Sequence, residues 1–152
     1  MIIYIEDLFR EINILNWYKG EAVKPNDPSA TAAETNADTQ DALMCHLKNA
    51  VTDVLSLANP NNLKFTCDYS DDRLTFSLSP IREGREYMLE LLKNCIRQYL
   101  VAEVRRLWMM NVRQEWADAT MRESLRQNIK DAMSACTKPT ERVRRRCTIM
   151  GI

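Results

Sequence analysis

The sequence predicts a mainly α-helical protein that contains one β-hairpin. Three observations support this. The 54 residues between Gly84 and Pro139 contain no glycine or proline, and most of them favour helix. Apolar residues elsewhere recur at the spacing of amphipathic helices. Between residues 63 and 78, apolar and polar residues alternate, as in strands. We therefore expect amphipathic helices around a long C-terminal helix, within a length of 152 residues that suits one domain.

Residues 1–18 are predicted to form an N-terminal helix. From residue 4 onward, charged residues separate an apolar series at helical spacing: Ile5, Leu8, Phe9, Ile12 and Leu15. Residues 19–37 then form a linker, because Pro25 and Pro28 interrupt regular structure. A linker of this length is unusual in a compact domain. We expect it to be an arm that is mobile in the isolated subunit and ordered in a complex.

Residues 38–138 are predicted to form a helical domain that includes the hairpin. Its first helix, capped by Asn36 or Asp38, runs to about Ala58. One face of this helix carries its apolar residues: Leu43, Leu47, Ala50, Val51, Val54 and Leu57.

The hairpin is predicted over residues 63–78, with a turn centred on Asp71 and Asp72. This register pairs Tyr69 with Leu74, Cys67 with Phe76 and Phe65 with Leu78. All six side chains then share one face. Because a lone hairpin is marginal in water, we expect that face to pack against apolar surface.

After the hairpin, Ser79 is expected to cap a helix with Pro80 in its first position. Gly84 interrupts this helix, and the long segment begins after that glycine. As one helix it would be about 80 Å long, whereas a compact domain of this size has a radius of gyration of about 15 Å. The apolar stripe changes face and density near Asn111, so we expect a bend or a break there. Trp108 and Trp116 flank this point, and they are interpreted either as core residues or as contacts with a partner.

The net charge of zero hides an asymmetry along the chain. Residues 1–72 contain 12 acidic and 5 basic residues, whereas residues 73–152 contain 16 basic and 9 acidic residues. Oppositely charged halves of this size either face each other within a subunit or attract neighbouring copies. The sequence leaves both arrangements open.

Residues 139–152 form a tail that is first basic and then apolar. Its predicted contact residues are Arg142, Arg144, Arg145, Arg146, Ile149, Met150 and Ile152. Three interpretations remain: contact with an acidic face of a neighbouring subunit or partner, a solvated tail, or contact with nucleic-acid phosphates. The balanced total charge weighs against the last, because dedicated nucleic-acid binders are usually basic overall.

No pattern of residues predicts catalysis or a bound cofactor or metal. His46 is the single histidine and is interpreted as structural. Asp68, Asp71 and Asp72 are interpreted as turn aspartates, not as a cation site. The five cysteines are widely spaced and expected to be reduced thiols. No segment resembles a signal peptide or a membrane span, so the expected location is the inside of a cell or an assembly formed there.

The order of two helices carries a resemblance to a known family. A helix from Ala42 to Leu57 precedes one that runs from Leu91 to Trp108. Over about a third of the chain, this order resembles the small helical head–tail connector proteins of tailed phages. The resemblance implies a ring-forming homo-oligomer without enzymatic activity, in which tail and linker wrap around neighbours. It also implies a location in a virion or the host cytoplasm.

From these features we expect a non-enzymatic structural subunit of a multi-subunit assembly, such as a phage neck or tail component. The alternative is a small helical dimeric regulatory or nucleic-acid-binding protein that uses the tail Arg142–Arg146.

Overall fold

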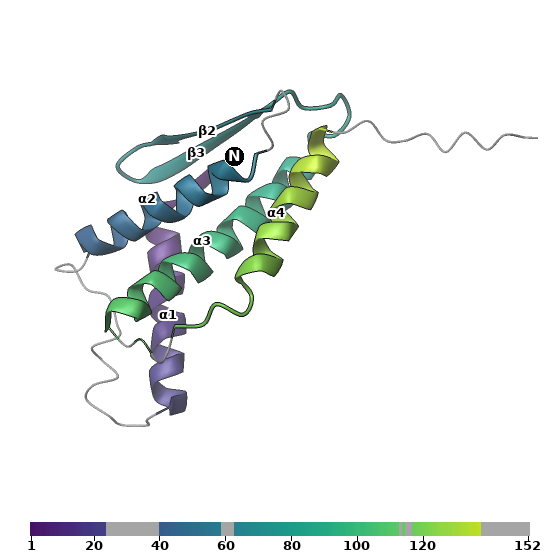
Figure 1. Ribbon diagram of the computed structural model, residues 1–152. Coiled ribbons are helices and arrows are strands. Elements are labelled where there is room, and N and C mark those ends of the chain that lie inside the picture. Colours follow the sequence, from purple (N-terminus) through teal and green to yellow (C-terminus); the bar gives the residue numbers. More distant parts are fainter. Residues whose placement is uncertain (24–39, 59–62, 113, 115–116, 138–152) are drawn as a thin grey trace, which may run out of the picture.

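The computed structural model describes residues 1–23, 40–58, 63–112, 114 and 117–137. In this part of the chain, a small sheet and four helices follow in the order β1(Ile2–Tyr4), α1(Ile5–Val23), α2(Gln40–Ser56), β2(Lys64–Tyr69), β3(Arg73–Ser79), α3(Met88–Val112) and α4(Arg122–Thr137) (Figure 1). The predicted mainly α fold with a small β element is confirmed.

The sheet has the strand order β1-β3-β2, and both pairs are antiparallel. The predicted hairpin is confirmed together with its register: Tyr69 lies opposite Leu74, Cys67 opposite Phe76 and Phe65 opposite Leu78. Strand β1 was not predicted. It pairs Ile3 with Leu74, so residues 2–4 belong to the sheet and the helix begins at Ile5.

The apolar face of the sheet lies on the helices, with α2 beneath the hairpin (Figure 1). Phe76 is 1% exposed and Leu74 is fully buried. The rings of Phe76 and Phe65 stack with their centroids 5.7 Å apart. Tyr69 was expected on the same buried face but is 44% exposed. Tyr69 is the last residue of β2, beside the turn. The alternation of apolar and polar residues extends to this position, but the side chain there is not buried.

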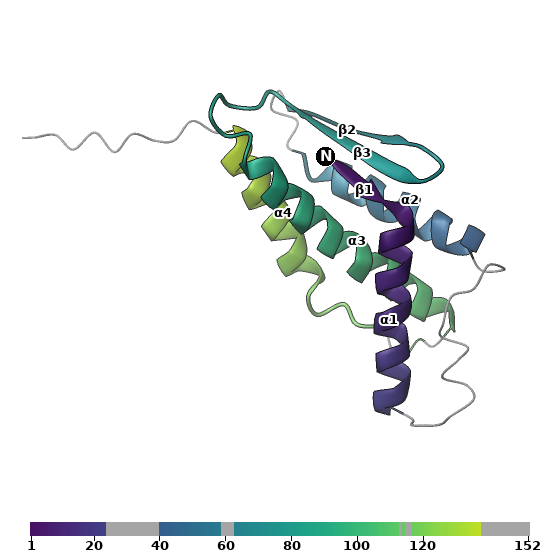
Figure 2. The same cartoon turned by 180° about the vertical axis from the view of Figure 1, so that it is seen from behind.

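The predicted break near Asn111 is confirmed, because α3 ends at Val112 and α4 returns along it (Figures 1 and 2). Folding back buries apolar residues of both helices against each other. The predicted helix start at Pro80 was wrong. The interruption expected at Gly84 is confirmed, because this residue has a φ of 76°, a left-handed conformation that breaks a helix, and α3 begins only at Met88.

The connection between the sheet and α3 is tied to the end of α4. The backbone N–H of Arg82 donates to the carbonyl oxygen of Cys136 at 3.1 Å. The C-terminal end of α4 therefore lies near the Ser79 end of β3, and the Arg73 end of that strand lies away from it.

Helix α1 extends to Val23, past the predicted end at residue 18. The rest of the predicted linker, with the cap candidates Asn36 and Asp38, lies outside the described residues. No helix in the described ranges is long and apolar enough to cross a bilayer. The core combines the predicted helical stripes with the sheet face; its largest fully buried side chains are Tyr99, Phe76, Leu8, Ile12, Leu43, Leu47, Leu74, Leu92, Ile96, Leu100, Met109 and Ile129.

Candidate interaction site

Most of the predicted contact residues lie outside the described part of the chain. These are Trp116 and the tail residues Arg142, Arg144, Arg145, Arg146, Ile149, Met150 and Ile152. Trp108 is described, and it is 6% exposed within the main core cluster. We therefore correct Trp108 from a partner contact to a core residue, because its side chain offers almost no surface to another protein.

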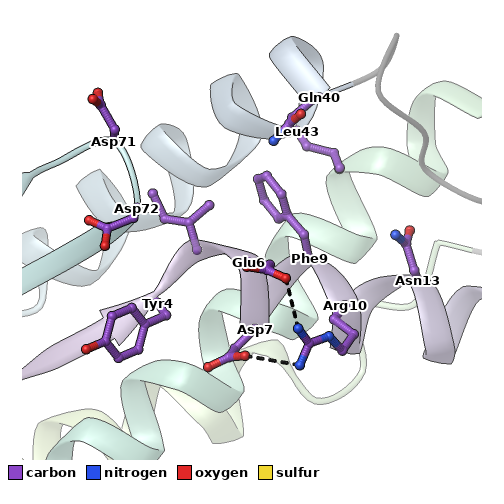
Figure 3. A pocket seen from close by; sticks show the side chains of 11 residues that line it. Tyr4, Glu6, Asp7, Phe9, Arg10, Asn13, Gln40, Leu43, Asp71 and Asp72 are labelled. Atoms are coloured by element: carbon purple, nitrogen blue, oxygen red, sulfur yellow. Dashed lines mark hydrogen bonds and ion pairs between the residues drawn. The ribbon is translucent and has the colours of Figure 1, made fainter.

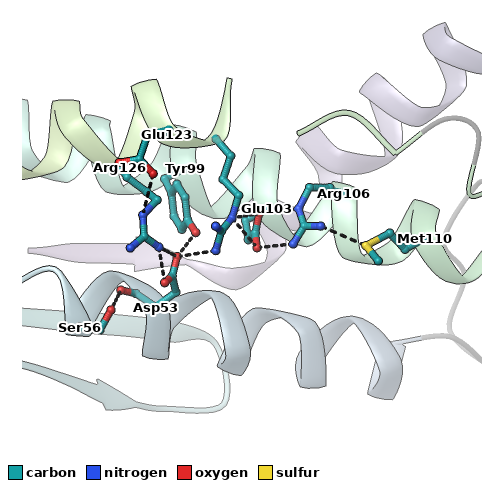
Figure 4. Close-up of polar contacts among 9 residues, drawn as sticks. Asp53, Ser56, Tyr99, Glu103, Arg106, Met110, Glu123 and Arg126 are labelled. Carbon is teal, nitrogen blue, oxygen red and sulfur yellow. Dashed lines mark hydrogen bonds and ion pairs between the residues drawn. The ribbon is translucent and has the colours of Figure 1, made fainter. Parts of the chain in front are cut away.

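The structure instead reveals an ion network between α2, α3 and α4, formed by Asp53, Tyr99, Glu103, Arg106, Arg122 and Arg126 (Figure 4). Asp53 projects from α2 toward the other two helices. Its carboxylate accepts hydrogen bonds from the Tyr99 hydroxyl and the Arg126 guanidinium, and from Arg122 Nη2 at 3.2 Å. One carboxylate on α2 thus connects to both neighbouring helices.

Glu103 on α3 is the second carboxylate of the ion network and is 5% exposed. Arg106 binds it with both ends of its guanidinium, Nη2 at 2.7 Å from Oε1 and Nε at 2.9 Å from Oε2. Arg122 Nε lies 3.2 Å from both oxygens. Arg122 therefore bridges Glu103 and Asp53, and it fixes α4 to α2 and α3 at the same point.

The environment of the ion network shifts the pKa values of its members. Burial alone would raise the pKa of Asp53, but hydrogen bonds from Arg126 and Tyr99 and the charges of Arg126 and Arg122 lower it on balance. For Glu103, burial is again outweighed, here by Arg106 and Arg122, and the pKa is lowered. Burial and the bond to Asp53 raise the pKa of Tyr99. Both carboxylates thus stay ionised and Tyr99 stays protonated near neutral pH.

These shifts predict a pH dependence of stability. A carboxylate whose pKa is lower in the folded state stabilises the fold fully above its unfolded pKa, about 4 for Asp and Glu. The contribution is lost as the pH falls through the folded pKa, because the unfolded state binds more protons there. We expect the free energy of unfolding, measured by urea titration, to fall steeply below about pH 4. The variant Asp53→Asn should show a shallower slope in that range. Equal slopes would contradict the assignment.

The ion network was not predicted from the sequence. A signal existed in the spacing of Tyr99, Glu103 and Arg106 along α3 and of Arg122 and Arg126 along α4, because residues three or four apart share a helix face. However, nothing local connects these faces to Asp53 on α2. Its two carboxylates bind three guanidinium groups from α3 and α4, so the network acts as a clamp between helices.

A groove lies between the first residues of α1, the first residues of α2 and the turn of the hairpin (Figure 3). We call it the acidic groove after its lining residues. Its volume is about 800 Å³. The lining residues are Tyr4, Ile5, Glu6, Asp7, Phe9, Arg10, Asn13, Gln40, Leu43, Asp71 and Asp72. Four carboxylates thus share the groove with one guanidinium, that of Arg10.

Arg10 neutralises only part of this charge. Its Nη2 lies 2.9 Å from Glu6 Oε1 and its Nη1 lies 3.4 Å from Asp7 Oδ1. Asp72 pairs with Arg73 at 3.1 Å. Asp71 has no ion pair within the described residues. The groove therefore combines apolar surface from α1 and α2 with a surplus of negative charge.

The histidine, turn aspartates and cysteines that were considered for catalysis or metal binding have structural roles or no assigned role. His46 Nε2 lies 3.2 Å from Asn111 Nδ2, and burial lowers its pKa. Asp71 and Asp72 lie at the hairpin turn. Within the described ranges, no three His, Cys, Asp or Glu side chains gather as a metal site. Four cysteines are described there and all are free thiols: Cys45, Cys67, Cys95 and Cys136.

Comparison of the chain with known protein families, with curated proteins and with solved structures finds no match.

Proposed function

We propose that this protein is a non-enzymatic structural subunit of a multi-subunit assembly, of the kind formed by head–tail connector proteins of tailed phages, and that the acidic groove is one of its contact sites. The observation that carries the proposal is the composition of that groove. Small-molecule pockets are mostly apolar with a few polar groups. Here charged or amide side chains outnumber apolar ones, as at the rim of a protein interface.

The charge distribution supports a basic partner for the groove. All four carboxylates of the groove lie in the acidic part of the chain, residues 1–72. Residues 138–152, in contrast, contain five basic residues and one acidic residue. Complementary patches of this kind speed association and favour the correct partner. The chain thus carries both halves of an electrostatic contact.

The clamped helices support the same role. A subunit that transmits its position to neighbours requires elements that do not slide, and the ion network joins α2, α3 and α4 at one place. Assembly in a virion neck or tail is the specific setting that the resemblance to connector proteins implies.

Light scattering coupled to size-exclusion chromatography tests this function. We expect the purified chain to elute with a mass several times 17.7 kDa, and the complex to weaken at high salt, because exposed charges are screened. A monomer at every concentration would contradict the proposal. A monomer or dimer that binds DNA in a salt-sensitive manner would support the alternative of a nucleic-acid-binding protein.

A further inference from the structure

We infer that the acidic groove of one subunit binds the arginine-rich C-terminal segment, residues 138–152, of a second copy of this chain. The inference rests on the proposed function, since it names the occupant of the same groove. It pairs the basic part of the segment, Arg142–Arg146, with the carboxylates of the groove, and the apolar end with the aromatic surface beside them.

The carboxylates are placed to receive several guanidinium groups at once. Glu6 and Asp7 belong to the first turn of α1, whereas Asp71 and Asp72 project from the hairpin turn (Figure 3). Each carboxylate has two acceptor oxygens, so the single contacts with Arg10 leave further acceptors on Glu6 and Asp7. Arginine suits these acceptors because its planar donors bind carboxylates in pairs.

The spacing of the arginines fits a groove with acids on both sides. In an extended segment, alternate side chains point the same way. Arg142, Arg144 and Arg146 would then face the groove together, about 7 Å apart, and Arg145 would point away. The apolar residues that follow would meet exposed aromatic surface, of which Tyr4, 49% exposed, is the largest part in the groove.

Geometry favours a second copy over the segment's own subunit. The groove lies at the Arg73 end of β3, and the end of α4 lies near the opposite end of this 7-residue strand. Those ends are about 20 Å apart. Residues 138–142 span at most about 18 Å when fully stretched. The backbone of Arg142 therefore falls short of its own groove even when the chain is fully extended, whereas a neighbouring copy imposes no such limit.

Reciprocal charge reversal in the full-length chain tests the inference. The groove variant is Glu6→Lys with Asp71→Lys, and the tail variant is Arg144→Glu with Arg146→Glu. The control, Glu83→Lys with Glu86→Lys, makes the same charge change as the groove variant at exposed positions near the other end of the sheet. Light scattering reports assembly, and circular dichroism with thermal melting reports folding. Asp71→Lys alone serves as a second groove variant should Glu6→Lys disturb α1.

We expect each charge-reversal variant to self-associate at least tenfold more weakly than the wild type, and the control to assemble normally. Mixing the groove variant with the tail variant should restore a complex that contains both, because one supplies an intact segment and the other an intact groove. A chain that carries both reversals should also assemble again.

Other outcomes would overturn the inference. If the wild type assembles and both variants assemble equally well, the groove is not the contact, although the proposed function survives. If the wild type is a monomer, the proposed function fails with it. Cross-links from the groove to residues 138–152 of the same chain, or to residues 24–39, would identify a different occupant. A tail variant that loses only DNA binding would assign the segment to nucleic acid.

Discussion

Replacing Phe76 with alanine is expected to lower the free energy of unfolding by about 3 to 5 kcal/mol. Phe76 lies in the central strand β3, is 1% exposed, and stacks on Phe65 at 5.7 Å. Removal of the Phe76 ring leaves a cavity between the sheet and the helices, because the closely packed neighbouring side chains do not move enough to fill it. Urea denaturation at neutral pH measures the change.

Ser77→Ala provides the matched control, since Ser77 is the next residue in β3 and faces solvent. We expect its effect to stay within about 0.5 kcal/mol. If Phe76→Ala costs less than about 1 kcal/mol, the apolar face of the hairpin is not packed in solution, and the arrangement of the sheet on α2 is wrong.

The second large effect is expected for Glu103→Gln, which keeps the shape of the side chain and removes its charge. We expect a loss of about 3 kcal/mol, because removing one partner leaves buried positive charge uncompensated. The Glu103 side chain is 6% exposed and holds both Arg106 and Arg122. Urea denaturation at neutral pH measures this change in the free energy of unfolding.

Glu123→Gln is the comparison on the surface. Glu123 also contacts an arginine of the ion network, Arg126, at 3.5 Å, but its side chain is 76% exposed. Exposed pairs contribute about 0 to 1 kcal/mol. If Glu103→Gln and Glu123→Gln lowered the free energy of unfolding equally, the ion network would not clamp the helices. Its buried and exposed contacts would then contribute alike.

The sequence was sufficient for the features that depend on local periodicity. Alternation placed Phe65, Cys67 and Phe76 on one face, and the acidic turn set the register. The stripes of α2 and α3 predicted most buried positions, and the change of stripe near Asn111 located the end of α3. Trp108 lies outside that stripe, and of its two interpretations, core residue or partner contact, its 6% exposure supports the core.

The features that were missed depend on pairs of residues far apart in the chain. β1 has only 3 residues, too few for a periodic signal, and its partner strand begins at Arg73. The ion network joins Asp53 to Arg126, and no local pattern predicts which helix faces meet. The acidic groove likewise gathers Glu6 and Asp71 through tertiary structure. The charge asymmetry predicted that such a surface exists but not where it lies.

The pairing of β1 with β3 also sets an order for events during synthesis. Ile2 to Tyr4 leave the ribosome about seventy residues before their partners, Thr75 to Arg73. The hairpin of β2 and β3 closes over a turn of a few residues and has no such delay. Local contacts form faster than distant ones. Strand β1 is therefore made before β2 and β3 but pairs after they have paired, and the nascent chain holds this apolar strand unpaired until the hairpin emerges.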